Sequence, residues 1–295
     1  MLGGTIKSLQ IGVRRRWLTG ITQALSATGA IWLITEIATK VSDQAEHWIK
    51  DHGYYYSAIV LATAAICFIK HIYEVRSVSF NLPTTNTKIE IRYGDLFKAQ
   101  SDWLIGVGEF FDSEVGQVVS KNSLHGKLIN NVYNGDANLF RSLVDKALVG
   151  VKGRSTQRLI SPKFKYDIGT TAVIANGSHK VIANGSHKVF LVAMSRTHPD
   201  THKASSDVPT LWIALRGALE SIHNHGNGVP ISLPLIGNGQ SSVNIDPQHL
   251  LRLIVLALVD YGRKVGLPNQ VSIIVPEDCF KMLDIREIWR DWRKR

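Results

Sequence analysis

The sequence predicts an α/β domain with a mixed or parallel sheet, preceded by a hairpin of two membrane-spanning helices. Two observations support this expectation. Apolar residues concentrate in the first eighty positions, and strand patterns alternate with helical patterns from position 88 onward. The chain has 295 residues, of which 44% are hydrophobic and 20% are charged, and this composition is globular. We therefore expect a membrane region over 1–80, a linker over 81–87 and a folded domain over 88–295.

Two uncharged runs near the N-terminus are long enough to cross a bilayer. The first covers Trp17–Thr35 and the second covers Gly53–Ile69. A spanning helix needs about 20 residues to cross about 30 Å of hydrocarbon. Three tyrosines begin the second run and Lys70 follows it, a composition typical of the membrane interface. The alternative is a helical hairpin buried in a soluble protein.

The charges beside these runs predict their orientation. Lys7 and Arg14–Arg16 give +4 before the first run, whereas four acidic and two basic residues between the runs sum to −2. Positive charge is retained on the cytoplasmic side of a membrane. We therefore expect both termini in the cytoplasm and the short connecting loop outside.

The basic excess and the cysteine count exclude several classes of protein. The net charge is +10, and the basic residues near the N-terminus and in the tail from Arg286 suit an anionic membrane surface. No nucleic-acid-binding module accompanies them, so no nucleic-acid partner is expected. Cys67 and Cys279 are too few for a disulfide framework or a multi-cysteine zinc site. The histidines, His125 among them, lack zinc-motif spacing, and surface or capping roles are expected for them.

The linker begins between Ser77 and Asn81 and ends at Thr87, and strand and helix patterns alternate after it. The strands are predicted at Lys88–Tyr93, Trp103–Val107, Thr170–Ala175, Val189–Met194, Val229–Leu235 and Val271–Val275. The helices are predicted at Ala137–Leu148, Thr210–His223 and Pro247–Val265. The last helix follows Asp246, an N-cap residue, and has proline at its first position.

The octapeptide VIANGSHK occurs twice in tandem, at Val173–Lys180 and Val181–Lys188. Each copy contains Asn-Gly, a signal for a tight hairpin turn. An insertion of eight residues preserves the face on which each strand residue lies, because eight is even. We expect one lengthened hairpin here.

Three predicted strands end in loops that could hold a ligand. The first runs into Gly94 and Asp95, the second into Gly106–Asp112, and the third into Pro234–Ser242. Glycines allow close approach of a ligand to the backbone, and free N–H groups with hydroxyls suit a phosphate. Because the carboxyl ends of parallel strands meet at one edge of a sheet, a shared cleft is expected.

From Ile89 onward the sequence resembles a macro domain, the module that binds ADP-ribose. The resemblance rests on IEIRYGDLF (Ile89–Phe97), WLIGVGEFFDS (Trp103–Ser113), PLIGNGQSS (Pro234–Ser242) and VSIIVPEDCF (Val271–Phe280). The segments Phe111–Gly116 and Ser120–Ile129 are similar to the divergent macro domain of Thoeris anti-phage effectors, which follows two N-terminal membrane helices. The resemblance implies a three-layer α/β/α fold with a mixed sheet.

The resemblance also implies a role for each loop. Asp95 would contact the adenine amine, with the Leu96 N–H nearby, and Phe280 would lie along the adenine. The residues around the diphosphate would be Gly237, Asn238, Gly239, Gln240, Ser241 and Ser242. The residues flanking the distal ribose and its attached group would be Gly106, Val107, Gly108, Glu109, Phe111 and Asp112. Their charge alone, apart from the resemblance, suggests that Glu109 and Asp112 form an acidic pair suited to a cationic conjugate.

The function that the resemblance implies is that of a Thoeris-type effector in the bacterial inner membrane, with two spans. A TIR-domain enzyme would make an ADP-ribose-type signal, histidine–ADP-ribose, which the macro domain would bind. The spans of a homo-oligomer would then disrupt the lipid bilayer and cause abortive infection. No cofactor, metal or catalytic residue is expected.

Two alternatives remain open from the sequence. ADP-ribosyl hydrolases of this fold usually carry an asparagine-rich loop, whereas this chain has Gly106-Val107-Gly108-Glu109, and this difference favours a reader over an enzyme. The first alternative is a membrane-anchored ADP-ribosyl hydrolase, with Glu109 or Asp112 as general base. The second alternative is a membrane scaffold without a ligand.

Overall fold

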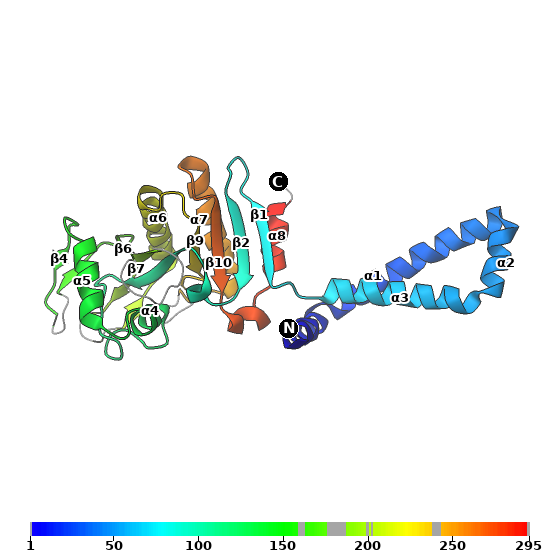
Figure 1. Ribbon diagram of the computed structural model, residues 1–295, viewed down its shortest axis with the longest axis horizontal. Coiled ribbons are helices and arrows are strands. Elements are labelled where there is room, and N and C mark those ends of the chain that lie inside the picture. The colour runs from blue at the N-terminus through cyan, green and yellow to red at the C-terminus, as the bar shows by residue number, and fades with distance from the viewer. Residues whose placement is uncertain are drawn as a thin grey trace. The chain divides into compact units, whose positions relative to one another are not determined.

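The computed structural model describes residues 2–158, 163–175, 187–198, 201, 203–237 and 243–293. The chain divides into two compact units, Met1–Val75 and Arg76–Arg295 (Figure 1). The first unit is helical and the second is an α/β unit. Each unit has its own packing.

The N-terminal unit consists of α1 (Leu2–Val41), α2 (Asp43–Asp51) and α3 (Gly53–Ile72). The long helices α1 and α3 pack against each other (Figure 1). A side chain at Gly12 would overlap the carbonyl oxygen of Ile72, so glycine allows the close approach of the two helices. Farther along the pair, the hydroxyls of Thr35 and Tyr56 lie 3.0 Å apart and share a hydrogen bond.

Two helices in the described part of the chain are long and apolar enough to cross a membrane, judged by length and composition. Their most apolar windows are 0% and 6% buried, so apolar side chains face outward. Leu25, Trp32 and Leu61 are all more than half exposed. Both predicted runs lie in these helices, and α1 extends beyond the first run at both ends. It continues through Arg16, where the backbone leaves helical geometry (φ −137°, ψ 19°).

The C-terminal unit contains a mixed sheet, as predicted. The strand order is β1 (Ser77–Asn81), β2 (Lys88–Tyr93), β10 (Gln270–Val275), β9 (Ile231–Pro234), β3 (Asp102–Gly108), β7 (Lys188–Thr197) and β6 (Thr171–Ala175). The five central strands are parallel, whereas β1 and β6 are antiparallel to their neighbours. The short β8 (Ala204–Ser205) pairs with β7, and β4 (Arg154–Ser155) pairs with β5 (Phe164–Lys165).

Helices cover both faces of this sheet, which gives the three layers expected (Figure 1). On one face, alternate β3 residues such as Trp103 and Ile105 pack with α4 (Leu124–Val132) and α5 (Ala137–Ala147) in one apolar cluster. On the other face, α6 (Val208–His225) packs on β7 and on α7 (Pro247–Lys264). The central strands β9 and β10 are buried along almost their whole length, as expected of parallel strands covered on both sides.

The six predicted strands and three predicted helices are confirmed, with ends shifted by a few residues. The linker expected over Ser77–Thr87 is wrong, because this segment forms β1 and the turn into β2. In β1 only Phe80 is buried, so the strand lacks a clear alternation of apolar residues. The duplicated octapeptide contributes Val173–Ala175 to β6 and Lys188 to β7, and Ala175 pairs with Lys188. The expected hairpin tip, residues 176–186, lies outside the described residues.

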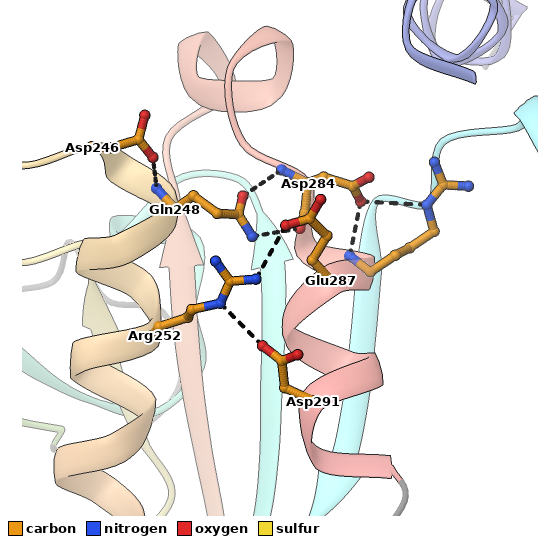
Figure 2. Close-up of polar contacts among 7 residues, drawn as sticks. Asp246, Gln248, Arg252, Asp284, Glu287 and Asp291 are labelled. Carbon is orange, nitrogen blue, oxygen red and sulfur yellow. Dashed lines mark hydrogen bonds and ion pairs between the residues drawn. The ribbon is translucent and has the colours of Figure 1, made fainter. Parts of the chain in front are cut away.

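The C-terminal helix α8 (Ile285–Arg293) was expected only as a basic tail. It packs on β1, and Trp292 stacks on Phe80 with ring centroids 6.2 Å apart. Figure 2 shows how α8 is fixed to α7: Arg252 donates to Asp291 at 3.0 Å and to Glu287 at 3.2 Å. This tail is therefore a structural part of the domain.

Just before α8, a second contact joins the same elements (Figure 2). The Gln248 side chain on α7 donates to the Asp284 carbonyl at 3.0 Å, and the Asp284 N–H donates back to the Gln248 side-chain oxygen at 2.9 Å. The side chain of Asp246 accepts from the Gln248 N–H at 2.7 Å and caps α7, as predicted. These contacts fix the start of α7 and the start of α8 to each other.

Candidate ligand-binding cleft

A cleft of about 790 Å³ lies at the carboxyl ends of the parallel strands. Residues at the ends of β2, β3, β7, β9 and β10 line it, together with the first turn of α4. This is the edge of an open α/β sheet where ligands usually bind. The predicted convergence of three loops on one cleft is therefore observed.

The end of β2 contributes Asp95 and Leu96 to the cleft. The Gly94 N–H donates to the Val275 carbonyl at 2.9 Å, which holds this turn against β10. The Asp95 side chain caps the short 3₁₀-helix Leu96–Lys98 by accepting from the Phe97 N–H at 3.0 Å. An aspartate that follows a strand commonly caps the next helix, and Asp95 has this structural role. Asp95 is also exposed in the cleft wall, where its second carboxylate oxygen can accept a further hydrogen bond.

The end of β3 contributes Gly106, Val107 and Gly108. A side chain at Gly106 would overlap the sulfur of Met194 on the neighbouring β7. A side chain at Gly106 would therefore displace the Met194 side chain, so the packing of β3 on β7 favours glycine here independently of any ligand.

The two carboxylates after β3 do not act as a pair. Glu109 does not line the cleft, and its side chain accepts from the Thr197 N–H at 3.3 Å. Asp112 lines the cleft, but its carboxylate is bound by the guanidinium of Arg158. The expectation of an acidic pair suited to a cation is therefore wrong, because one carboxylate holds the end of β7 and the other is neutralised.

Two predicted aromatic contacts also lie elsewhere. Phe111 is buried in the apolar cluster under α4 and α5, where its ring packs edge-on against Tyr166 with centroids 5.6 Å apart. Phe280, in the 3₁₀-helix that follows β10, is buried and lies edge-on to Tyr93 with ring centroids 4.7 Å apart. Neither ring lines the cleft. Pro276, Glu277 and Asp278 line it at the end of β10 instead.

The end of β9 contributes Gly237 to the cleft. The Val243 N–H donates to the Gly237 carbonyl at 3.1 Å and so closes the base of the loop between them. Asn238, Gly239, Gln240, Ser241 and Ser242, which were expected around a diphosphate, lie outside the described residues. Their contact with a ligand stays a prediction.

The first turn of α4 is the part of the cleft that the sequence analysis missed. Ser123 caps this helix by accepting from the Gly126 N–H at 3.0 Å, and Ser120, Asn122 and Lys127 line the cleft beside it. A helix N-terminus presents unpaired N–H groups and a partial positive charge to an anion. Serine is a typical N-cap residue, so Ser123 is the feature of the sequence from which the start of this helix could have been predicted.

His125 lies in this turn and also lines the cleft. It is buried against Phe140, with ring centroids 5.5 Å apart, so the expected surface role is wrong. Burial lowers the pKa of His125 to about 4, because the charged imidazolium loses its hydration. The wall beside the helix N-terminus therefore carries a neutral imidazole at pH 7.

The described residues contain no group of three or more His, Cys, Asp or Glu side chains that could hold a metal ion. The basic residues Arg92, Lys98 and Lys127 line the cleft, and Glu277 beside them is paired with Arg76. Arg92 also lies 3.9 Å from a carboxylate oxygen of Glu90. The cleft thus combines basic side chains with a helix N-terminus, a combination that suits a polyanion.

Comparison with known proteins identifies the domain. Residues 89–276 match the family model described as Thoeris protein ThsA, Macro domain. Among solved structures, a glycine-to-valine mutant of the Oceanobacillus iheyensis macrodomain with ADPR has a TM-score of 0.51 and 13% identity. That match covers 74% of this chain and 100% of the macrodomain. An asparagine-to-alanine mutant of the same macrodomain has a TM-score of 0.50 and 12% identity, with coverage of 74% and 95%. These two likenesses show the fold alone, and a search of curated proteins finds no match.

Proposed function

The chain belongs to the family of the Thoeris ThsA macro domain, and from this premise we propose that it is a membrane effector switched on by an ADP-ribose-type signal. The observation that carries the proposal is the cleft at the strand ends, which joins a helix N-terminus and basic side chains in the fold of a macro domain. The same chain carries two long helices whose apolar side chains face outward. A signal-binding unit and a membrane unit are thus joined in one polypeptide.

We infer the position of an extended nucleotide in the cleft from the order of the strands. Asp95 follows β2 and Asp112 follows β3, and these strands are three positions apart in the sheet, with β9 between β10 and β3. Adjacent strands are about 4.8 Å apart, so the two ends are separated by about 14 Å. We place the adenine near Asp95, the diphosphate between Gly237 and the first turn of α4, and the distal ribose near Gly108. The basic side chains in the wall would offset the charge of the diphosphate.

We propose that the protein reads its ligand and does not hydrolyse it. The two carboxylates considered as general bases are engaged: Glu109 by the Thr197 N–H, and Asp112 by Arg158. A general base must reach the proton that it removes and must be free to accept it. The proposed signal is histidine–ADP-ribose made by a TIR-domain enzyme.

The proposed output is disruption of the bacterial inner membrane, which leads to abortive infection. Both termini would face the cytoplasm, and α1 and α3 would rearrange or associate within a homo-oligomer. A ligand shifts such an equilibrium only if it binds one arrangement more tightly than the other. The proposal therefore requires that the affinity for the signal differ between the resting and active arrangements.

Calorimetry and vesicle leakage test this proposal on the full-length chain. We expect histidine–ADP-ribose to bind more tightly than ADP-ribose, and to release dye from vesicles that contain the protein and anionic lipid. Asp95→Ala should weaken binding and leakage together, whereas Asp145→Ala, on α5 outside the cleft, should leave both unchanged. Equal binding of both compounds, or of neither, would refute the signal. Release of ADP-ribose from a modified protein would favour the hydrolase.

A further inference from the structure

A kink divides α1 into two helices of different direction. The backbone leaves helical geometry at Arg16, so residues 2–15 form a segment of their own. The whole of α1 has 40 residues and a length of about 60 Å, whereas the hydrocarbon of a bilayer is about 30 Å thick. The part after the kink, from Trp17 to Val41, is about 37 Å long and is sufficient for one span. The segment 2–15 is therefore not needed to cross the membrane.

One side of this segment packs against the end of α3. Ser8, Ile11 and Gly12 stand at positions i, i+3 and i+4 of the helix, and all three are buried. A side chain at Gly12 would overlap the carbonyl oxygen of Ile72, the last residue of α3. Gly20, beyond the kink, lies against Ile72 as well. The segment is thus held at the level at which α3 ends, which is the level at which a spanning α3 would leave the membrane.

A second side of the segment is apolar and exposed. Ile6, Leu9 and Val13 are spaced by three and four residues, so they form one stripe along the helix. Ile6 is 54% exposed and Val13 is 43% exposed, and Leu9 is half-buried. At 3.6 residues per turn, this stripe lies on a different side of the helix from Ser8 and Gly12. An apolar stripe that remains open beside a membrane-spanning helix suits an apolar partner.

The charges of the segment favour a lipid surface over a second copy of the chain. Lys7 and Arg14 are exposed, and the first 35 residues contain no acidic residue. Arg15 and Arg16 are paired with Glu74. Two copies joined through the apolar stripe would bring like charges together, whether the helices ran parallel or antiparallel. Anionic phospholipid headgroups would instead neutralise the exposed basic side chains.

We propose that residues 2–15 form an amphipathic helix that lies along the membrane surface. The apolar stripe enters the boundary between headgroups and acyl chains, and Lys7 and Arg14 bind anionic phospholipid headgroups. An apolar stripe beside basic residues is typical of helices that lie in this interface. Trp17, the first residue after the kink, is 49% exposed, and tryptophan is enriched at the same level of a membrane. The inference rests on the membrane location in the proposed function, and it adds a lipid-binding element outside the two spans.

Quenchers attached to lipids test this placement in the full-length chain. Cys67→Ala removes the half-buried thiol of α3, and Ile6→Cys then accepts the fluorophore NBD. In nanodiscs of phosphatidylglycerol and phosphatidylcholine, a nitroxide near the headgroups should quench this label, and its emission should shift to shorter wavelength. Cys279 is buried, and the Cys67→Ala chain without a new cysteine measures any labelling there.

Charge variants show whether anionic headgroups hold the segment. Lys7→Gln and Arg14→Gln, each combined with the labelled Ile6→Cys, should lower the ratio of docked to undocked segment about fivefold. Nanodiscs of phosphatidylcholine alone should reduce the quenching in the same way. Lys40→Gln is the matched control, because Lys40 lies at the other end of α1 and is paired with Glu36. This control should leave the quenching unchanged.

A label on Leu25→Cys separates failure of the inference from failure of the proposed function, because Leu25 is an exposed residue of the span. Quenching at Leu25→Cys without quenching at Ile6→Cys would overturn the inference alone. No quenching at either position would refute the membrane location itself. Equal quenching at Ile6→Cys with and without phosphatidylglycerol would overturn the binding of anionic headgroups. Energy transfer between copies labelled at Ile6→Cys, with no quenching by lipid, would overturn the inference in favour of a second copy.

Discussion

The buried imidazole of His125 makes the stability of the domain depend on pH. Its pKa is lowered by burial to about 4 in the folded chain, against an ordinary value of 6.5. The unfolded chain therefore takes up the proton first as the pH falls. The stabilisation by neutral His125 is fully present above about pH 6.5 and is lost as the pH falls toward 4.

The size of the effect follows from the two pKa values. A shift of one unit corresponds to about 1.4 kcal/mol, so the whole loss is about 3 kcal/mol, and about 2 kcal/mol of it is lost between pH 7 and pH 5. Carboxylates also titrate in this range, so the measurement must isolate His125. His125→Phe keeps an aromatic ring beside Phe140 and removes the titration.

Urea unfolding followed by tryptophan fluorescence provides the assay, since Trp103 is buried in the domain core. Between pH 7 and pH 5, the wild-type chain should lose about 2 kcal/mol more unfolding free energy than His125→Phe. His223→Phe, at an exposed position on α6, should lose as much as wild type. If wild type and His125→Phe lose the same free energy within about 0.5 kcal/mol, His125 is not a buried neutral base.

Three further predictions concern packing. Gly106→Ala places a methyl group against Met194 and should lower the unfolding free energy by about 1–3 kcal/mol, with partial recovery in Gly106→Ala/Met194→Ala, as thermal unfolding can show. Gly12→Val should separate α1 from α3 and so reduce disulfide crosslinking between cysteines placed on the two helices. The control is Gly29→Val, where a side chain meets no neighbour within 4 Å, and it should leave the crosslinking unchanged. Arg252→Ala breaks the contacts to Glu287 and Asp291, but these side chains are more than a third exposed, so chemical denaturation should show a loss of about 1 kcal/mol or less. A loss above about 3 kcal/mol would contradict this view of the contact.

Local pattern was sufficient for most of the fold. The alternation in Lys88–Tyr93 and the continuous apolar run in Val271–Val275 reflect burial on one or both faces, and both strands form as predicted. Strand β1 was not predicted, because an edge strand needs few apolar residues. Helix α4 was not predicted, because its nine residues are too few to show a clear helical pattern. Both depend on packing contacts that distant parts of the chain provide.

The cleft was predictable in position but not in its chemistry. Loops after parallel strands must meet at one edge, so Asp95, Gly106 and Gly237 converge as expected. Arg158 is 46 residues from Asp112, and no local pattern indicates that the two will meet. The sequence likewise shows a histidine at position 125 but not the burial that makes it neutral. Charge at this site is set by tertiary contacts, and counting carboxylates in the sequence did not reveal that Arg158 pairs with one of them.

The position of β1 has a mechanical consequence. The strand begins at Ser77, within five residues of the end of α3, and pairs with β2 at five successive positions from Ser77 to Asn81. A pull on the chain at Arg76, directed along the strand, would load all the rungs of this ladder together in shear instead of opening them one at a time. The stacking of Trp292 on Phe80 adds resistance at the same strand. A force along β1 would thus be shared by all five paired positions, so the strand would resist such a force better than one that peels it from β2.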